Sequence, residues 1–178
     1  MVTFVLALAL LVAVGVLLTF VVGYNKLRAA DVRVDEALGG IDVELTRRAA
    51  LLPALVSTVG AVAQHERATL ERVTAARAAL TSATAGASVA QRSAAERQLN
   101  RALGQVLKVG AGHPQLNSSN NFLHLQQTLA DTEDKLAFAR QYYNDAVATL
   151  NRTIGTIPWM LVAGSAGVTE RDYYQDEP

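Results

Sequence analysis

An uncharged, apolar run over residues 2–23 constrains the fold of this chain more than any other feature. At ~1.5 Å per residue, a helix of this length measures roughly 33 Å, enough to cross a hydrocarbon core of ~30 Å. Leu, Val, Phe and Ala occupy every face of that helix, and no polar stripe marks it as the half-buried helix of a soluble core. The run is therefore predicted to be a transmembrane anchor.

A cleavable signal peptide is the competing interpretation of this run. Such a peptide has a basic beginning, an apolar core of about 7–15 residues and a small-residue cleavage site. Here no basic side chain precedes the run, the run is longer, and Val21, Val22 and Gly23 form only a passable cleavage site. An uncleaved anchor is the better interpretation. Because the chain contains no cysteine, attachment is expected to rest on this helix and not on a lipidated cysteine.

All charged residues follow the run, and the 16 Lys and Arg balance the 16 Asp and Glu. Balanced charge argues against nucleic acid as a partner. Lys26, Arg28 and Arg33 lie just after the run and no Lys or Arg precedes it, so the positive-inside preference predicts an outer amino terminus and a cytoplasmic domain.

After the anchor, apolar residues recur in two columns with a seven-residue step, the pattern of a helical seam. The columns are Leu27, Val34, Ile41, Leu55 and Val62, and Leu38, Leu45, Leu52 and Val59. Gly39, Gly40 and Pro53 leave the phase intact, so kinks are expected there rather than loops. The pattern continues weakly to Leu80 and ends in the small, polar residues 81–87.

Two further helices follow in the sequence. Ser88 with Gln91, or Ser93 with Glu96, supplies a capping box for a helix that reaches about Val109. The loop at residues 110–114 precedes the last helix, which is expected to begin near residues 117–120 and to end at Pro158. Its column is Phe122, Leu129, Leu136, Tyr143, Leu150 and Ile157.

These patterns predict an all-α chain: an N-terminal transmembrane helix followed by an elongated antiparallel helical bundle of three to four helices. The predicted divisions are an anchor over residues 1–23, a bundle over residues 24–158 and a tail over residues 159–178.

Motifs for catalysis and metal binding are missing from the sequence. A di-iron bundle needs Glu-x-x-His pairs, and none of His65, His113 and His124 has Glu three positions before it. Neither phosphate-binding glycine motif occurs, and residues 164–167 lack the spacing of a nucleophile elbow. We therefore predict no enzyme, no cofactor, no metal and no small-molecule substrate.

Arg48 is the most informative polar residue, because it falls on an apolar column between Ile41 and Leu55. A guanidinium there needs a carboxylate or must reach the surface, and Glu133 on the last helix is the predicted partner. A structural ion pair that fixes helix register and a contact to another subunit both remain open. Arg47, Asp42 and Arg140 complete the ion-pair or interface candidates.

Trp159, Met160 and Leu161 follow the proline and are too apolar for water. If the last helix returns antiparallel to the first, they lie near the membrane surface, where Trp is favoured, together with Tyr24. In a parallel arrangement they would instead contact another subunit.

Several sequence blocks resemble the LemA family of bacterial membrane proteins. They are YNKL at residues 24–27, IDVELTRR at 41–48, LLPALV at 51–56, HE at 65–66, NF at 121–122, TE at 132–133 and ARQYYN at 139–144. The resemblance implies a single-pass anchor, an outer amino terminus, a helical bundle and no established catalytic activity. Residues 81–91 and the tail depart from the family pattern.

These observations lead to two functional expectations. The first is a homo-oligomeric scaffold at the cell (inner) membrane, with the lipid bilayer and further copies of the chain as partners. The alternative is a membrane-tethered adaptor that docks a partner protein such as a membrane protease.

Overall fold

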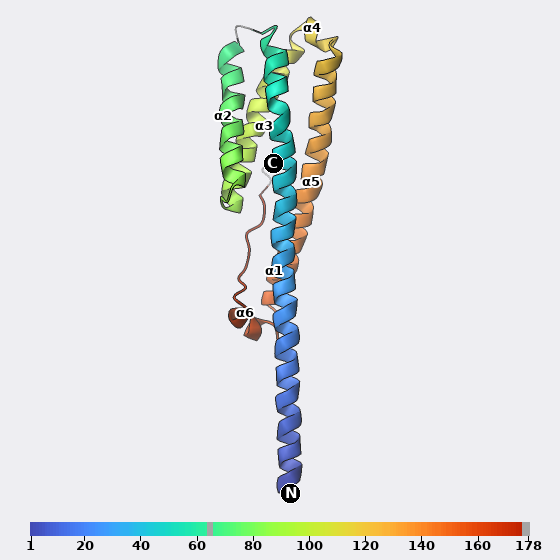
Figure 1. Ribbon diagram of the computed structural model, residues 1–178, viewed down its shortest axis with the longest axis vertical. Coiled ribbons are helices and arrows are strands. Elements are labelled where there is room, and N and C mark those ends of the chain that lie inside the picture. The colour runs from blue at the N-terminus through green and yellow to red at the C-terminus, as the bar shows by residue number, and fades with distance from the viewer. Residues whose placement is uncertain (64–65, 176–178) are drawn as a thin grey trace. The chain divides into compact units, whose positions relative to one another are not determined.

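The computed structural model describes residues 1–63 and 66–175, and helices are the only regular elements in these ranges. They are α1 (Val2–Gly60), α2 (Arg67–Thr84), α3 (Val89–Ala111), α4 (Pro114–Asn117), α5 (Asn120–Ile154) and α6 (Met160–Ala166). The prediction of an all-α chain with a long apolar first helix is confirmed (Figure 1). His65, which belongs to one resembling block, lies outside the described residues.

Helix α1 runs without interruption from Val2 to Gly60 and contains Pro53. Pro53, Gly39 and Gly40 all lie on the exposed side of the helix. On that side a missing backbone donor leaves a carbonyl that water can satisfy, so the helix tolerates the proline.

The chain divides into two compact units, and both α1 and α5 contribute to each. Unit 1 comprises Met1–Ala37 and Asn144–Arg171, and unit 2 comprises Leu38–Tyr143 and the tail from Asp172.

Unit 2 is a four-helix bundle in which successive long helices reverse direction (Figure 1). Asn121 Nδ2 donates to Thr58 Oγ1 at 3.0 Å, and Arg48 pairs with Glu133. Lower numbers on α1 thus meet higher numbers on α5, as antiparallel packing requires. Helix α2 packs along α3, where Arg72 Nη1 lies 3.4 Å from Gln105 Oε1.

The predicted seam residues form most of the core. Ile41, Leu45, Leu52, Leu55 and Val59 of α1 are buried in unit 2, as are Phe122, Leu129, Leu136 and Tyr143 of α5. Leu38 and Val62 are only half-buried.

The prediction that the first helical pattern continues to Leu80 was wrong. Helix α1 ends at Gly60, and a separate helix α2 begins at Arg67 and buries its own face, including Val73 and Leu80. A seven-residue spacing of apolar residues does not show whether the chain reverses direction. The buried face of α2, which runs back along the bundle, therefore resembles a continuation of the apolar columns of α1.

The ends of α3 and α5 show which local signals decide helix boundaries. Ser88 and Gln91 form the predicted capping box of α3, whereas Ser93 and Glu96 are buried inside that helix. Helix α5 ends at Ile154, before Gly155. Ile157 is 77% exposed, so the prediction that it belongs to the apolar column of the last helix was wrong. Gly155 ends the helix three residues ahead of the proline.

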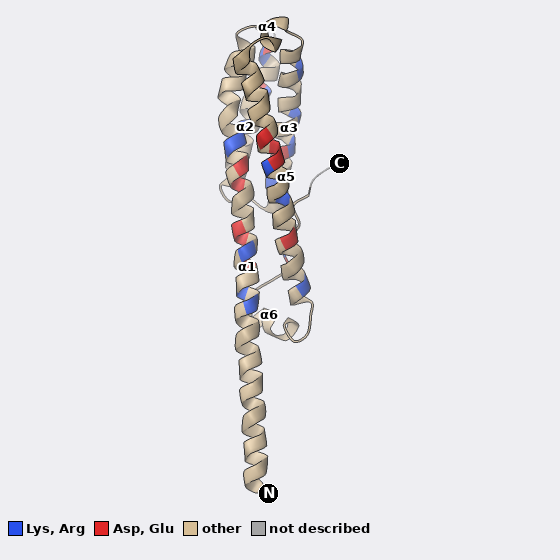
Figure 2. Cartoon of the chain, turned by 90° about the vertical axis from the view of Figure 1, so that its right-hand side faces the viewer, with Lys and Arg blue, Asp and Glu red and all other residues tan. Residues whose placement is uncertain are grey.

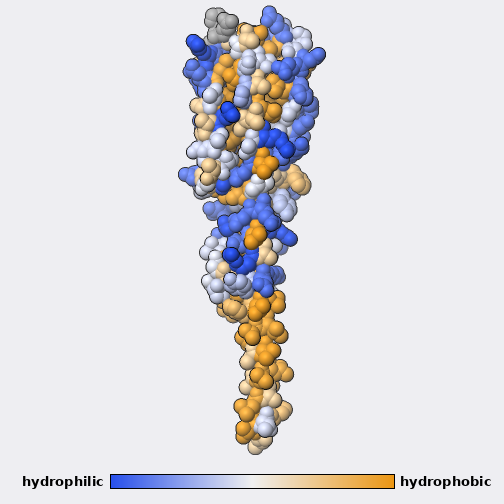
Figure 3. All heavy atoms as spheres, viewed as in Figure 1, coloured by the Kyte–Doolittle hydropathy of each residue, from blue (hydrophilic) through white to orange (hydrophobic). Residues whose placement is uncertain are grey.

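Unit 1 contains the N-terminal part of α1, the end of α5 and α6. Residues 1–22 are all exposed, and α1 is the one described helix long and apolar enough to cross a membrane. Figure 2 shows no Lys, Arg, Asp or Glu on this segment, and Figure 3 shows its hydrophobic surface.

Candidate functional site: a buried ion network and an apolar cluster at Gly23

Four charged side chains from three helices meet inside unit 2. Arg48 of α1 pairs with Glu133 of α5, and Arg140 of α5 bridges Glu133 Oε1 at 3.1 Å and Glu96 Oε1 of α3 at 2.6 Å. Arg48, Glu96 and Arg140 are buried, whereas the side chain of Glu133 is 38% exposed. The two positive and two negative charges balance, which lowers the cost of burying them.

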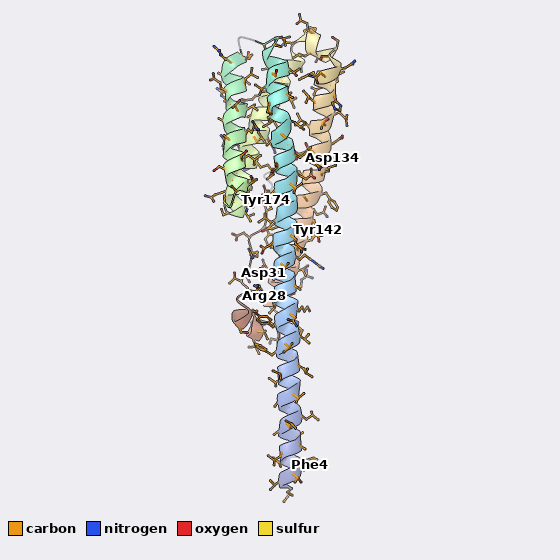
Figure 4. The ribbon with its side chains drawn as sticks, in the orientation of Figure 1. Phe4, Arg28, Asp31, Asp134, Tyr142 and Tyr174 are labelled. Carbon is orange, nitrogen blue, oxygen red and sulfur yellow. The ribbon has the colours of Figure 1, made fainter. Side chains whose placement is uncertain are left out.

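The tail from Asp172 closes this network. Tyr174 is 3% exposed, and its hydroxyl donates to Glu96 Oε2 at 2.6 Å. Its ring packs edge-on against Tyr143, whose own hydroxyl donates to the Asp172 carbonyl at 2.8 Å. Ser93 Oγ donates to the Gln175 carbonyl, also at 2.8 Å. The label in Figure 4 marks where Tyr174 lies.

Burial shifts the pKa values of two members of this network. It lowers the pKa of Arg48, with Glu96 opposing the shift and Arg140 adding to it. Burial also raises the pKa of Tyr174, and the charge of Glu96 and the hydrogen bond to it act in the same direction. Tyr174 therefore stays a neutral donor at physiological pH.

A second ion pair joins α1 to α3 in unit 2. Arg92 Nε lies 3.0 Å from Asp42 Oδ1, and Arg92 Nη1 donates to the Ala87 carbonyl at 2.6 Å. Burial raises the pKa of Asp42, and Arg92 opposes this shift by its charge and hydrogen bonding. The pair ties the start of α3 to α1.

The structure thus brings Arg48, Glu133 and Arg140 together, whereas Asp42 belongs to a separate ion pair with Arg92 in the same unit. Arg47 lies apart, on the surface, where it pairs with Glu44 at 3.0 Å. Sequence reasoning missed Glu96, Arg92 and Tyr174. Glu96 was considered only as a capping residue, although a carboxylate on the buried face of α3 was the available signal.

Chemically, this network suits holding helices in register better than transforming a substrate. Among the residues that the structure describes, no group of three or more His, Cys, Asp or Glu side chains is placed to hold a metal ion. The buried charges pair with one another, and each joins two elements of the bundle. We interpret them as the fixed polar core of unit 2.

In unit 1, Trp159 packs against α1 at the end of the apolar run. A Cβ atom on Gly23 would lie 2.7 Å from Trp159 Cε3, so only glycine leaves room for the indole ring. Lys26 Nζ lies 5.0 Å from the centre of the same ring, a cation–π distance. Met160 and Leu161 are exposed, and so is Tyr24, whose ring lies 6.4 Å from that of Phe20.

Unit 1 also contains an ion cluster on the polar part of α1. Arg171 Nη2 lies 2.8 Å from Asp31 Oδ1 and 3.1 Å from Asp35 Oδ1, and Asn151 exchanges two hydrogen bonds with the backbone of Arg171. Figure 4 labels Asp31 and Arg28, which lie 3.6 Å apart at their closest charged atoms.

An exposed apolar helix of membrane-spanning length and a helical bundle with a paired polar core define a membrane-associated helical-bundle protein. The sequence model of the LemA family matches residues 37–178. The chain therefore belongs to the LemA family.

Curated relatives match a shorter part of the chain. Two magnetosome proteins of Paramagnetospirillum magneticum, MamQ 1 and MamQ 2, are 31% identical over 84 residues, and MamQ of Magnetospirillum gryphiswaldense is 29% identical over the same length. The match covers 47% of this chain and 31% of each relative. The chain thus spans about a third of the length of these relatives.

Proposed function

We propose that this protein is a non-enzymatic scaffold that self-associates into a homo-oligomer at the cell (inner) membrane. The observation that carries the proposal is apolar surface on unit 2, which lies outside the predicted anchor. Phe138 is 72% exposed, and Val43, Tyr142 and Leu123 are also exposed. Water is a poor environment for such side chains, and contact between copies of the chain would cover them.

The mass of the full chain in lipid nanodiscs or mild detergent tests self-association. We expect a discrete oligomer at micromolar concentration and its weakening in Phe138→Ser. Leu123→Ser, at a less exposed apolar position of the same helix, should weaken it as well, and the matched control is Ala130→Ser, at an exposed position with a small side chain. A strict monomer would overturn the scaffold proposal. An oligomer that neither Phe138→Ser nor Leu123→Ser weakens would show that the exposed apolar residues of unit 2 do not form the contact between copies.

We further propose that the amino terminus lies outside and the bundle in the cytoplasm, as the basic residues after the run favour. The natural absence of cysteine permits a direct test with two single-cysteine variants, Thr3→Cys and Ser118→Cys, both at exposed positions. A membrane-impermeant maleimide should label position 3 on intact cells and position 118 only after permeabilisation. The reverse pattern would overturn this orientation.

The alternative function is a membrane-tethered adaptor, and an apolar groove between α1 and α2 supports it. The groove consists of two hollows of about 210 Å³ and about 310 Å³, and Arg77 contributes to the lining of both. Leu45, Ala49, Leu52, Pro53, Val56 and Leu80 contribute to its lining. Crosslinking from Ala50→Cys in cells distinguishes the two functions: products with another protein that exceed self-crosslinks favour the adaptor.

A further inference from the structure

Helix α6 is held against α1 at one defined level, the end of the charge-free run. Trp159 and Val162 both approach Gly23, and an added Cβ there would lie 2.7 Å from the indole and 3.4 Å from Val162 Cγ2. Val162, Ala163 and Ala166 of α6 are all buried. The packing fixes which part of α6 remains uncovered.

The uncovered part of this segment is apolar. Leu161 is 76% exposed and Met160 is 51% exposed, and Ile157, just ahead of the helix, is 77% exposed. Because residues 1–22 are exposed and apolar as well, the exposed side chains of the α6 segment continue an apolar surface that already requires lipid.

The charges beside this segment suit the headgroup level of a bilayer. Lys26 lies over the Trp159 ring, and Arg28 follows half a turn later. An indole at the boundary with a basic side chain directed toward the polar side is the arrangement that the membrane–water interface favours.

We propose that residues 157–161 form a lipid-binding element that enters the boundary between headgroups and acyl chains, with Lys26 facing the lipid phosphates. The bilayer is the occupant of this apolar face. The chain would then attach to the membrane in two ways, through the spanning helix and through an interfacial segment that packs against it. This attachment does not depend on self-association of the bundle.

Trp159 is the single tryptophan of the chain, so its fluorescence reports this site directly. The full chain is reconstituted in phosphatidylcholine vesicles that carry bromine either near the headgroup or near the acyl-chain end. We expect stronger quenching by the shallow label than by the deep one. We also expect acrylamide quenching about twofold weaker than for a fully hydrated tryptophan, as burial at the interface requires.

Two substitutions sharpen the test. Leu161→Ser should reduce quenching by the shallow bromine label, and Gly23→Val, which displaces the indole ring, should change it as well. Phe138→Ser is the matched control, because Phe138 is similarly exposed but belongs to unit 2, and it should leave Trp159 quenching unchanged.

Two results would overturn the proposal. Full acrylamide quenching without any effect of brominated lipid would place Trp159 in water. Protection from acrylamide without lipid quenching would mean that protein alone, either α1 of the same chain or a second copy, shields the indole. Flotation of the chain with the vesicles reports on the spanning helix separately, and the oligomer mass reports on the scaffold function.

Discussion

The stability of unit 2 depends on a few buried charged residues and their partners. Arg48, Glu96 and Arg140 are all buried, so each depends on its partners for a charge that water would otherwise solvate. Removing one member costs more than removing an oppositely charged pair, because the single change leaves a net charge inside the bundle.

Arg48→Met tests this balance. We expect it to lower the free energy of unfolding by about 2–3 kcal/mol, since it leaves a buried negative charge in excess, although the partial exposure of Glu133 moderates the cost. The double variant Arg48→Met/Glu133→Leu restores neutrality and should recover most of the loss. Urea unfolding of the full chain in detergent measures both; equal losses in the single and double variants would contradict the interpretation.

Tyr174→Phe removes one hydroxyl and keeps the aromatic contact with Tyr143. Glu96 then loses a short hydrogen bond in a buried place, so we expect about 1–3 kcal/mol of destabilisation. Tyr173→Phe, at the exposed neighbouring residue, is the control and should have no measurable effect. A thermal melt followed by circular dichroism compares them, and similar melting temperatures for the two variants would argue against a structural role of the hydroxyl.

Asp42 gives a pH dependence of known sign. Burial raises its pKa above the ordinary value of 3.8, so the folded chain retains a proton at pH values where the unfolded chain has lost it. Acidification from about pH 6 to about pH 4 should therefore stabilise the native protein relative to Asp42→Asn. The difference in unfolding free energy between the two proteins is the measurement, and a stability of the native protein that decreases relative to Asp42→Asn on acidification would contradict the assignment.

At this scale the sequence predicted the meeting of Arg48 with Glu133 but missed most of what surrounds them. Arg48 could be singled out because it interrupts an apolar column. Tyr174 could not, because it lies in an irregular tail with no period to relate it to Glu96, 78 residues away.

Among the helices, α3 contains one glycine with no space for a side chain and another with open space beside it. Gly110 lies against the buried Phe122 ring, and a Cβ there would be 2.9 Å from Phe122 Cε2. Gly104 has no heavy atom within 4 Å of an added Cβ. Close packing against Phe122 therefore requires glycine at position 110, whereas the packing at position 104 would also accommodate alanine.

Gly110→Ala should therefore destabilise the bundle by about 1–3 kcal/mol through overpacking. Gly104→Ala should stabilise it by about 0.5–1 kcal/mol, because alanine favours an exposed helical position. Chemical unfolding of both variants provides an internal comparison within one helix. A stabilised Gly110→Ala would show that Phe122 moves aside at little cost.

Helical periodicity predicted the elements well where it extended over many turns. The columns of α1 and α5 identified their buried faces because a consistent phase over five heptads leaves little ambiguity. The reversal between Gly60 and Arg67 escaped notice, since Gly60 was its main local signal and the phase of α2 matched that of α1.

For the whole molecule, the apolar run and the bundle should be separable. Residues 1–22 are exposed along their whole length, so they contribute little packing to the rest of the chain. Phe4, labelled in Figure 4, projects from a part of α1 that no other described element covers.

Deletion of residues 2–21 should consequently leave a helical protein that is soluble without detergent and is bound to membranes only peripherally. Circular dichroism should show a cooperative melt, and an alkaline carbonate wash should remove the deleted chain, but not the full chain, from the membrane fraction. Tyr24→Ser in the undeleted chain serves as the control and should remain in the membrane. A deleted chain that fails to fold would show that the run has a structural role beyond anchoring.

The tail contacts also bear on which substitutions the tail tolerates. Tyr143 and Ser93 bind the carbonyl oxygens of Asp172 and Gln175, and Asn151 binds the amide and carbonyl of Arg171. Every residue type offers a carbonyl oxygen, so these contacts carry almost no sequence information. Positions 172, 173 and 175 should therefore accept other residue types at little cost to docking, whereas position 174 contributes a side-chain hydroxyl to Glu96 that few other residue types could replace.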